Sequence, residues 1–278
     1  MTLTDSPADT AGALPALALS APVNLRDLGG LPVAGGTVRE GFAIRADDLS
    51  TITADDAARL VDRGLRAVVD LRSADEVALT GRGPLGEQRA VTYHHVPFMV
   101  SIGEATAGTA DADPAEMLDQ SRFGRMYLRM VEGAAPQIVT ALAIVAHSPG
   151  AVAFHCAAGQ DRTGVLAASL LLALGAEQDV VVADYARTGE NSAAIMARLA
   201  PVMQPLMARF GFDLDEAARA SVRTEFSPAP MRELIAALVE RHGDPLAPLR
   251  AAGLTDGLID RLRERALDAA PVDGAGTA

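Results

Sequence analysis

Residues 151–164, with the sequence AVAFHCAAGQDRTG, combine the residue types that can hold a phosphate-sized anion. An apolar strand leads to Cys156, the only cysteine in the chain, a loop containing Gly159 follows, and Arg162 stands where an apolar helix begins. The backbone N–H groups of such a loop and the positive end of the helix dipole attract an anion. We therefore expect the loop amides to form an anion cradle that the planar guanidinium of Arg162 completes. The loop residues expected to bind the anion are Ala157, Ala158, Gly159 and Gln160.

The thiol of Cys156 would lie beneath this anion as a nucleophile. The helix N-terminus and the nearby guanidinium favour the thiolate, which is the reactive form of cysteine. The expected chemistry is a metal-free phospho-enzyme route: the thiolate attacks phosphorus, an acid protonates the leaving alcohol, and water hydrolyses the thiophosphate. His155 is expected to hydrogen-bond local backbone and hold the sulfur in place, and Thr163 to donate to the departing sulfur.

The spacing Cys-x5-Arg with a preceding His resembles the protein-tyrosine phosphatase signature. The longer string His-Cys-x-x-Gly-x-Asp-Arg-Thr-Gly is similar to that of the atypical bacterial tyrosine and lipid phosphatases. Residues 24–30 (NLRDLGG) resemble the opening Asn-Phe-Arg-Asp-x-Gly-Gly of that family, and residues 70–76 resemble its Asp-Leu-Arg loop. The resemblance covers residues 22–268 and implies a cofactor-free phosphatase. The residues outside the loop that it suggests for substrate binding are Arg26, Asp27 and Arg72.

The leaving group needs a proton, and an aspartic acid can supply it. The resemblance places an acid at Asp161, inside the loop, where the substrate is near. Asp70 is the second candidate because it ends a strand, where parallel-sheet enzymes gather functional groups. Asp75 and Glu76 follow on the next loop as further alternatives. We favour Asp161 over Asp70.

Gln160 departs from the family pattern, which commonly has Lys at this position. An amide retains hydrogen bonding but loses the Coulombic attraction for additional phosphates. We therefore expect a phosphotyrosine protein or peptide as substrate, with dual-specificity or phosphoinositide (phospholipid) hydrolysis as the alternative.

The elements that must position these residues alternate between strand and helix, which predicts an α/β fold with a mostly parallel sheet flanked by helices. The expected strands are residues 42–45, 66–71, 91–96 and 151–154. The expected helices are residues 54–63 with Thr53 as N-cap, 114–131, 136–147, 164–174, 177–185, 192–210, 228–241 and 255–267. Residues 22–270 are predicted to form one phosphatase domain between a flexible arm, residues 1–21, and a disordered tail, residues 271–278. The Met-rich helix 192–210 either packs in the core or, as the resemblance implies, belongs to a helical lid over residues 187–225.

The composition excludes several classes of function. The chain has 24 basic residues, all of them Arg, against 36 acidic residues, a net charge of −12 that disfavours nucleic acid and anionic membranes as partners. Without Lys, Schiff-base chemistry and the P-loop of nucleotide hydrolases are excluded. A single cysteine permits neither an intramolecular disulfide nor a cysteine-built zinc site. The chain shows no secretory signal and no apolar run of ~18 residues, so we expect a cytoplasmic protein without integral membrane association, metal or cofactor.

Structural interpretations stand beside these functional ones. A lone cysteine is usually a small core residue, Arg26 and Asp27 could pair and pin the N-terminal turn, and Arg72 could be a surface charge. His94 and His95 are adjacent on a strand and point to opposite faces, so no metal pair is expected. Three rival functions are a rhodanese-like sulfurtransferase, which does not call for the Asp-Arg-Thr-Gly continuation, an arsenate reductase, which needs resolving thiols, and a non-catalytic phospho-binding module, which needs no nucleophile.

Overall fold

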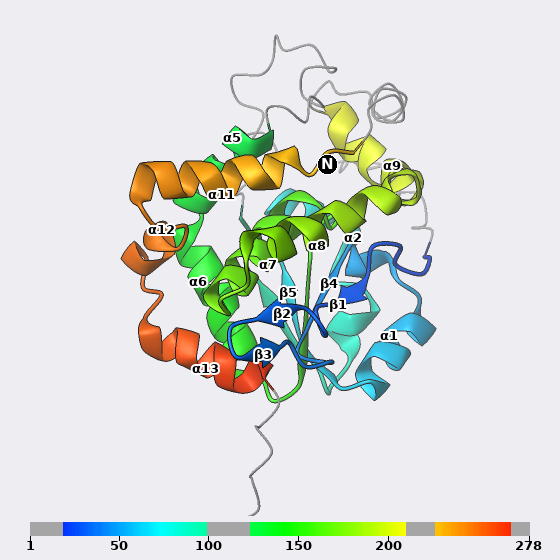
Figure 1. Ribbon diagram of the computed structural model, residues 1–278. Helices are drawn as coiled ribbons and strands as arrows, with labels where there is room; N and C mark the ends of the chain where they lie inside the picture. Colours follow the sequence, from blue (N-terminus) through cyan, green and yellow to red (C-terminus); the bar gives the residue numbers. More distant parts are fainter. Residues whose placement is uncertain (1–18, 99–122, 210–225, 268–278) are drawn as a thin grey trace, which may run out of the picture.

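The computed structural model describes residues 19–98, 123–209 and 226–267, and a five-stranded sheet lies at its centre (Figure 1). The strand order is β1 (Arg26–Asp27), β4 (Ala43–Ala46), β7 (Ala151–His155), β5 (Leu65–Asp70) and β6 (Thr92–His95). Strands β4, β7, β5 and β6 are parallel, whereas β1 pairs antiparallel with β4. A separate pair is formed by β2 (Pro32–Val33) and β3 (Gly36–Thr37). The predicted mostly parallel α/β architecture is confirmed.

Helices cover both faces of the sheet. The larger apolar cluster joins one face to α5 (Phe123–Gly133), α6 (Ala135–His147), α7 (Asp161–Ala173), α8 (Gln178–Glu190), α11 (Ala229–His242), α12 (Ala247–Ala251) and α13 (Asp256–Ala266). The smaller cluster joins the other face to α1 (Ala54–Asp62) and two short 3₁₀ turns, η1 (Leu49–Thr51) and η2 (Pro84–Glu87). The helices α2 (Ala74–Thr80) and α9 (Ser192–Arg209) contact each other at the edge where the parallel strands end.

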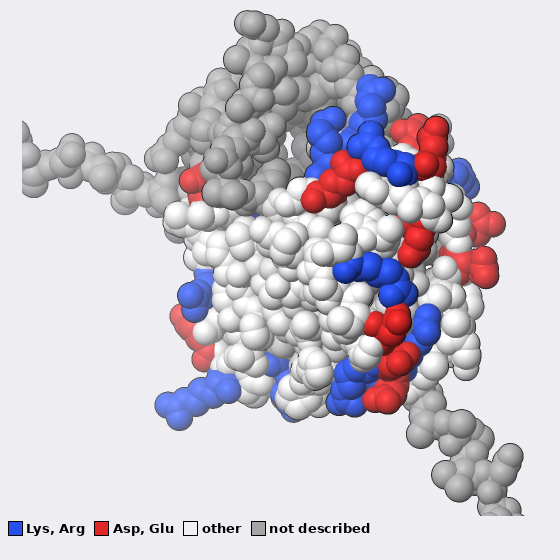
Figure 2. Space-filling model, turned by 90° about the vertical axis from the view of Figure 1, so that its left-hand side faces the viewer, with Lys and Arg blue, Asp and Glu red and all other residues white. Residues whose placement is uncertain are grey.

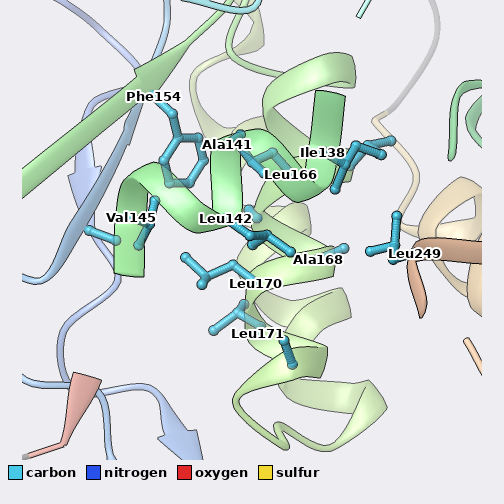
Figure 3. Close-up of a cluster of buried hydrophobic side chains, with 14 of the residues drawn as sticks. Ile138, Ala141, Leu142, Val145, Phe154, Leu166, Ala168, Leu170, Leu171 and Leu249 are labelled. Carbon is cyan, nitrogen blue, oxygen red and sulfur yellow. The ribbon is translucent and has the colours of Figure 1, made fainter. Parts of the chain in front are cut away.

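Strand β7 shows why the middle of the sheet is apolar throughout. Val152 and Phe154 belong to the larger cluster, whereas Ala151 and Ala153 belong to the smaller one. Phe154 lies close to α6 and α7, whose leucines fill this layer (Figure 3). A strand that is covered on both faces consists of a continuous run of apolar residues, and this pattern predicted β7.

Most predicted elements are present with shifted ends. Thr53 caps α1 as expected, its hydroxyl accepting from the amide of Asp56. Helix α7 begins at Asp161 rather than at residue 164, so the loop acid and Arg162 lie in its first turn. Helix α2 was not predicted. The expected helical residues 114–122, the tail 271–278, most of the arm and residues 210–225 of the expected lid lie outside the described residues.

The charged side chains in Figure 2 are interspersed in sign and surround an uncharged area on that face. The described part of this face therefore presents no continuous basic surface. Within the described ranges, no single helix is long and apolar enough to cross a membrane; α5 and α6 together would be, but they are bent by 77° relative to each other.

Candidate active site

Strand β7 places Cys156 at the carboxyl edge of the sheet. The strand is buried at every residue and held between β4 and β5, so its end is fixed on both sides. Cys156 is only 1% exposed, and the loop after it leads into α7 at Asp161. The strand, loop and helix N-terminus are therefore arranged as residues 151–164 predicted.

The loop carbonyls are tied to the surrounding structure. The amide nitrogen of Asp48 donates to the oxygen of Ala157 at 3.1 Å. Asn24 Nδ2 lies 3.3 and 3.2 Å from the carbonyl oxygens of residues 158 and 159, and Arg45 Nη2 donates to the latter at 2.9 Å. Because the C=O and N–H of a trans peptide point in opposite directions, these bonds turn the amides of residues 158–160 away from the protein body. The arrangement builds an anion cradle from backbone N–H groups.

Gly159 lets the loop pass close to strand β4. Its φ is +69°, a left-handed conformation that favours glycine. A Cβ at this position would lie 2.6 Å from the carbonyl oxygen of Ala46 and 2.7 Å from the nitrogen of Asp47. A side chain here would therefore strain the backbone and push the loop off the sheet edge.

A buried carboxylate holds the guanidinium of Arg162. Glu76 accepts from Nη1 at 2.5 Å and from Nη2 at 2.8 Å, and the same carboxylate accepts from the amide of Ser73 as part of the capping box of α2. Burial raises the pKa of Glu76, but the charge and hydrogen bonds of Arg162 outweigh it, so the net pKa is below the ordinary value. Glu76 is therefore ionised and paired with Arg162, whereas a general acid must carry a proton. This argues against Glu76 as the general acid, for which it was one of the alternatives from the sequence. Burial lowers the pKa of Arg162, but the charge and hydrogen bonds of Glu76 outweigh this effect, so the net pKa is raised and the guanidinium stays charged.

Asp161 has the environment of a proton donor. Its Oδ1 accepts from the hydroxyl of Tyr127 at 2.6 Å. Burial raises the pKa of Asp161, and this effect exceeds the lowering by Tyr127 and by Arg162. The acid is thus biased toward its protonated form next to the anion cradle.

Asp70 has the opposite environment. It is fully buried, and Arg72 Nη2 lies 2.6 Å from its Oδ2, which also accepts from the hydroxyl of Tyr93. Burial raises the pKa of Asp70, but its interactions with His155 and with the guanidinium of Arg72 lower it well below the ordinary value. The arrangement therefore favours Asp161 as the acid, in agreement with the preference from the sequence.

Arg72 is buried and has hydrogen-bond partners of its own within the protein. The interpretation as a surface charge is therefore wrong. Its guanidinium donates to the side chains of Asp70, Asp48, Ser50 and Thr80 and to the carbonyl of Gly81. These bonds occupy the N–H groups of Arg72 that, according to the resemblance, would bind a substrate.

Arg26 and Asp27 also have structural partners, but they do not pair with each other. Arg26 lies 2.9 Å from Asp184 and donates to Asn24 Oδ1 at 2.7 Å, which orients the amide that holds the loop. Asp27 accepts from the amides of Gly29 and Gly41 at 2.8 and 2.7 Å. Both residues therefore stabilise the N-terminal turn around the site, and their role in substrate binding stays a prediction.

His155 ends β7 directly before Cys156, and Thr163 lies in the first turn of α7. His155 is buried, its Nδ1 accepts from the amide of Leu49 at 3.3 Å, and burial lowers its pKa, so the ring is neutral. The ring thus holds the backbone, as expected. The hydroxyl of Thr163 is buried without a hydrogen-bond partner among the described residues, which leaves it available for an anion or for sulfur.

Helix α9 borders the loop. Arg198 lies 2.7 Å from Asp47 Oδ2 and donates to the carbonyl of Asp48 at 2.8 Å. A crevice of about 210 Å³ separates the helix from the loop and is lined by Asp47, Asp48, Thr51, Ala157, Ile195, Arg198, Leu199 and Val202. Ile195 and Val202 are buried, so this helix both packs on the protein and covers one side of the site. Its opening as a lid stays a prediction.

The sequence did not reveal four supporting residues of the site. Asn24 and Arg45 hold the loop carbonyls, and Tyr127 and Tyr185 contact each other at 2.8 Å behind Asp161. Asn24 was visible as part of a motif, but neither tyrosine had a local signal. Among the described residues there is no group of three His, Cys, Asp or Glu side chains that could hold a metal ion.

Comparison with known proteins identifies the family. The sequence profile of the tyrosine phosphatase family matches residues 17–268. The chain belongs to this family. This phosphatase is 29% identical to the triple specificity protein phosphatase PtpB of Mycobacterium tuberculosis over 277 residues, which cover 86% of this chain and 95% of the relative.

Two further relatives agree with this assignment. A Cupriavidus necator protein, named as a candidate tyrosine-protein phosphatase, is 34% identical over 224 residues, or 73% of this chain and 78% of its own. A tyrosine-protein phosphatase of Nostoc commune is 32% identical over 148 residues, covering 51% of this chain and 47% of the relative. The predicted family and class of enzyme are confirmed.

Proposed function

We propose that the protein hydrolyses phosphotyrosine in proteins or peptides, without a metal ion, through a cysteinyl-phosphate intermediate. The thiolate of Cys156 attacks phosphorus, the bond from phosphorus to the phenolic oxygen breaks, and Asp161 gives its proton to that oxygen. The loop amides and Arg162 hold the non-bridging oxygens as charge shifts in the transition state. The observation that carries the proposal is the Arg162 guanidinium, which Glu76 holds with two hydrogen bonds in the first turn of the helix that follows the Cys156 loop.

The second step returns the enzyme to its starting state. A water molecule attacks phosphorus, the carboxylate of Asp161 takes the proton of that water, and the phosphorus–sulfur bond breaks. The hydroxyl of Thr163, which has no other partner among the described residues, donates to the departing thiolate. A phospho-binding module would need neither this hydroxyl nor an aspartic acid whose pKa burial raises, as at Asp161, which favours an enzyme.

Substrate preference depends on the charge of the loop and of the protein as a whole. The amide of Gln160 adds no positive charge for additional phosphates, and the net charge of −12 opposes binding to an anionic lipid surface. The relative named for triple specificity keeps phosphoserine and lipid phosphates as the second candidate class. We propose that phosphotyrosine is preferred.

Parallel kinetics on a phosphotyrosine peptide, the matching phosphoserine peptide and a phosphoinositide in mixed micelles test this proposal. The expected order of kcat/KM places phosphotyrosine first, with activity unchanged by a chelator and abolished in Cys156→Ser. A higher kcat/KM for the phosphoinositide would overturn the substrate preference. Activity in Cys156→Ser would overturn the mechanism.

A further inference from the structure

Two tyrosines from separate helices meet behind Asp161. Tyr127 lies on α5 and Tyr185 on α8, both are buried, and their hydroxyls are 2.8 Å apart. The Tyr127 hydroxyl also donates to Asp161 Oδ1 at 2.6 Å. Because a phenol has one proton, Tyr127 gives it to Asp161, and Tyr185 must donate to Tyr127. The side chain of Gln160 faces Tyr185 in turn, so the chain of hydrogen bonds begins and ends on adjacent loop residues.

We propose that Tyr127 is a positioning residue for the general acid, and that Tyr185 orients it. The bond from Tyr127 to Oδ1 makes this oxygen an acceptor, so the transferable proton of Asp161 resides on Oδ2. The carboxyl group is thereby presented with one oxygen toward the helices and its acidic oxygen toward the anion cradle. This inference rests on the proposed function, in which Asp161 protonates the leaving group.

The packing of the two rings is separable from their hydrogen bonds. Their centroids are 6.0 Å apart with an interplanar angle of 77°, an edge-to-face contact that phenylalanine retains. Tyr185 also packs on Phe226 at 5.3 Å. Replacing either tyrosine by Phe removes one hydroxyl and leaves the aromatic layer in place.

The direction of the expected effect follows from the groups around Asp161. These groups are Arg162 on its own helix, Tyr127 on α5, Tyr185 on α8 and Arg45 on β4, which acts on Tyr185. Tyr127 stabilises the ionised carboxylate, so loss of its hydroxyl raises the pKa of Asp161. Asp161 must be protonated to act as the acid, so kcat/KM falls as pH rises through this pKa. The alkaline limb of the profile should therefore move to higher pH.

The test compares Tyr127→Phe, Tyr185→Phe and Asp161→Asn in pH profiles of kcat/KM for p-nitrophenyl phosphate and for an alkyl phosphate, with thermal unfolding as a check on folding. We expect Tyr127→Phe to move the alkaline limb up by about 0.5 to 1 in pH and to lower kcat about 2- to 10-fold, more for the alkyl ester. Tyr185→Phe should move the limb less. An unmoved limb in Tyr127→Phe, or equal shifts in both variants, overturns the inference.

Asp161→Asn separates this inference from the proposed function. If that variant retains the alkaline limb, the assignment of the acid fails; if it loses the limb while Tyr127→Phe does not move it, only the role of Tyr127 fails. A second measurement retains the hydroxyl: uniform replacement of the 3 tyrosines by fluorotyrosine gives Asp161 a stronger donor. The limb should then move to lower pH, and an upward shift or none contradicts the proposal.

Discussion

The substitution Glu76→Gln tests whether the fixed orientation of Arg162 matters for catalysis. The wild-type pair has two charge-assisted hydrogen bonds of 2.5 and 2.8 Å between buried groups. An amide has one oxygen, so the variant can replace the two bonds, about 1.5–3 kcal/mol each, with one weaker bond of about 0.5–1.5 kcal/mol. The net loss of about 2.5–4.5 kcal/mol corresponds to about 70- to 2,000-fold if it appears fully in kcat/KM.

The assay is kcat/KM on a phosphotyrosine peptide together with inhibition by inorganic phosphate, and Ser73→Ala is the matched control. Ser73 forms the other half of the capping box, accepting from the amide of Glu76 at 3.3 Å, and does not contact Arg162. Its loss should lower the free energy of unfolding by about 1 kcal/mol and leave kcat/KM within about twofold. If Glu76→Gln stays within threefold of the wild type, or if Ser73→Ala loses as much activity, the reasoning is refuted.

The same pair has a defined pH dependence. The folded-state pKa of Glu76 lies below its ordinary value of 4.5, because the effect of Arg162 exceeds that of burial. The stabilisation by this group is therefore present above pH 4.5 and is lost as pH falls through the lower, folded-state pKa. The difference in free energy of unfolding between wild type and Glu76→Gln should shrink over that acid range.

Three further substitutions test the general acid Asp161, the buried pair of Asp70 and Arg72, and the covering of the site by α9. Asp161→Asn should reduce kcat/KM on p-nitrophenyl phosphate by about 10²–10⁴-fold and less on aryl phosphates with more acidic leaving groups; a uniform loss across leaving groups would argue against Asp161 as the acid. Asp70→Asn should lower the free energy of unfolding in urea by about 1.5–3 kcal/mol, because it removes the nearer carboxylate of the buried Arg72 and leaves only Asp48 at 3.3 Å, while the alkaline limb of the rate profile stays in place; loss of that limb would instead assign the acid to Asp70. Arg198→Ala removes the contact of α9 with Asp47 and should accelerate alkylation of Cys156 by iodoacetamide, whereas an unchanged rate would show that α9 does not restrict access.

The reactive loop could be predicted because its chemistry is local. Residues 151–164 contain the strand, the nucleophile, the turn glycine and the helix start, and each has a signal within a few positions. The buried strands were equally clear from their apolar runs. Helix α2 was missed because it has only seven residues, although Ser73 and Glu76 have the spacing of a capping box.

The supporting contacts could not be predicted because they join distant parts of the chain. Glu76 and Arg162 are 86 positions apart, and Asn24 is 135 positions from Gly159. Tyr127 approaches Asp161 over 34 positions only because α5 packs on α7. The same limit explains why the partners of Arg26, Asp27 and Arg72 could not be predicted, because these partners are set by the fold. The expected cytoplasmic location stays a prediction.

Direct detection of the phospho-enzyme tests the central claim, that Cys156 is the nucleophile. The protein is mixed with a phosphotyrosine peptide, quenched within milliseconds, digested and analysed by mass spectrometry. We predict one phosphoryl group per chain, bound to the sulfur of Cys156 and accumulating when Asp161→Asn slows its hydrolysis. A phosphoryl group on another residue, or full turnover in Cys156→Ser, would contradict it.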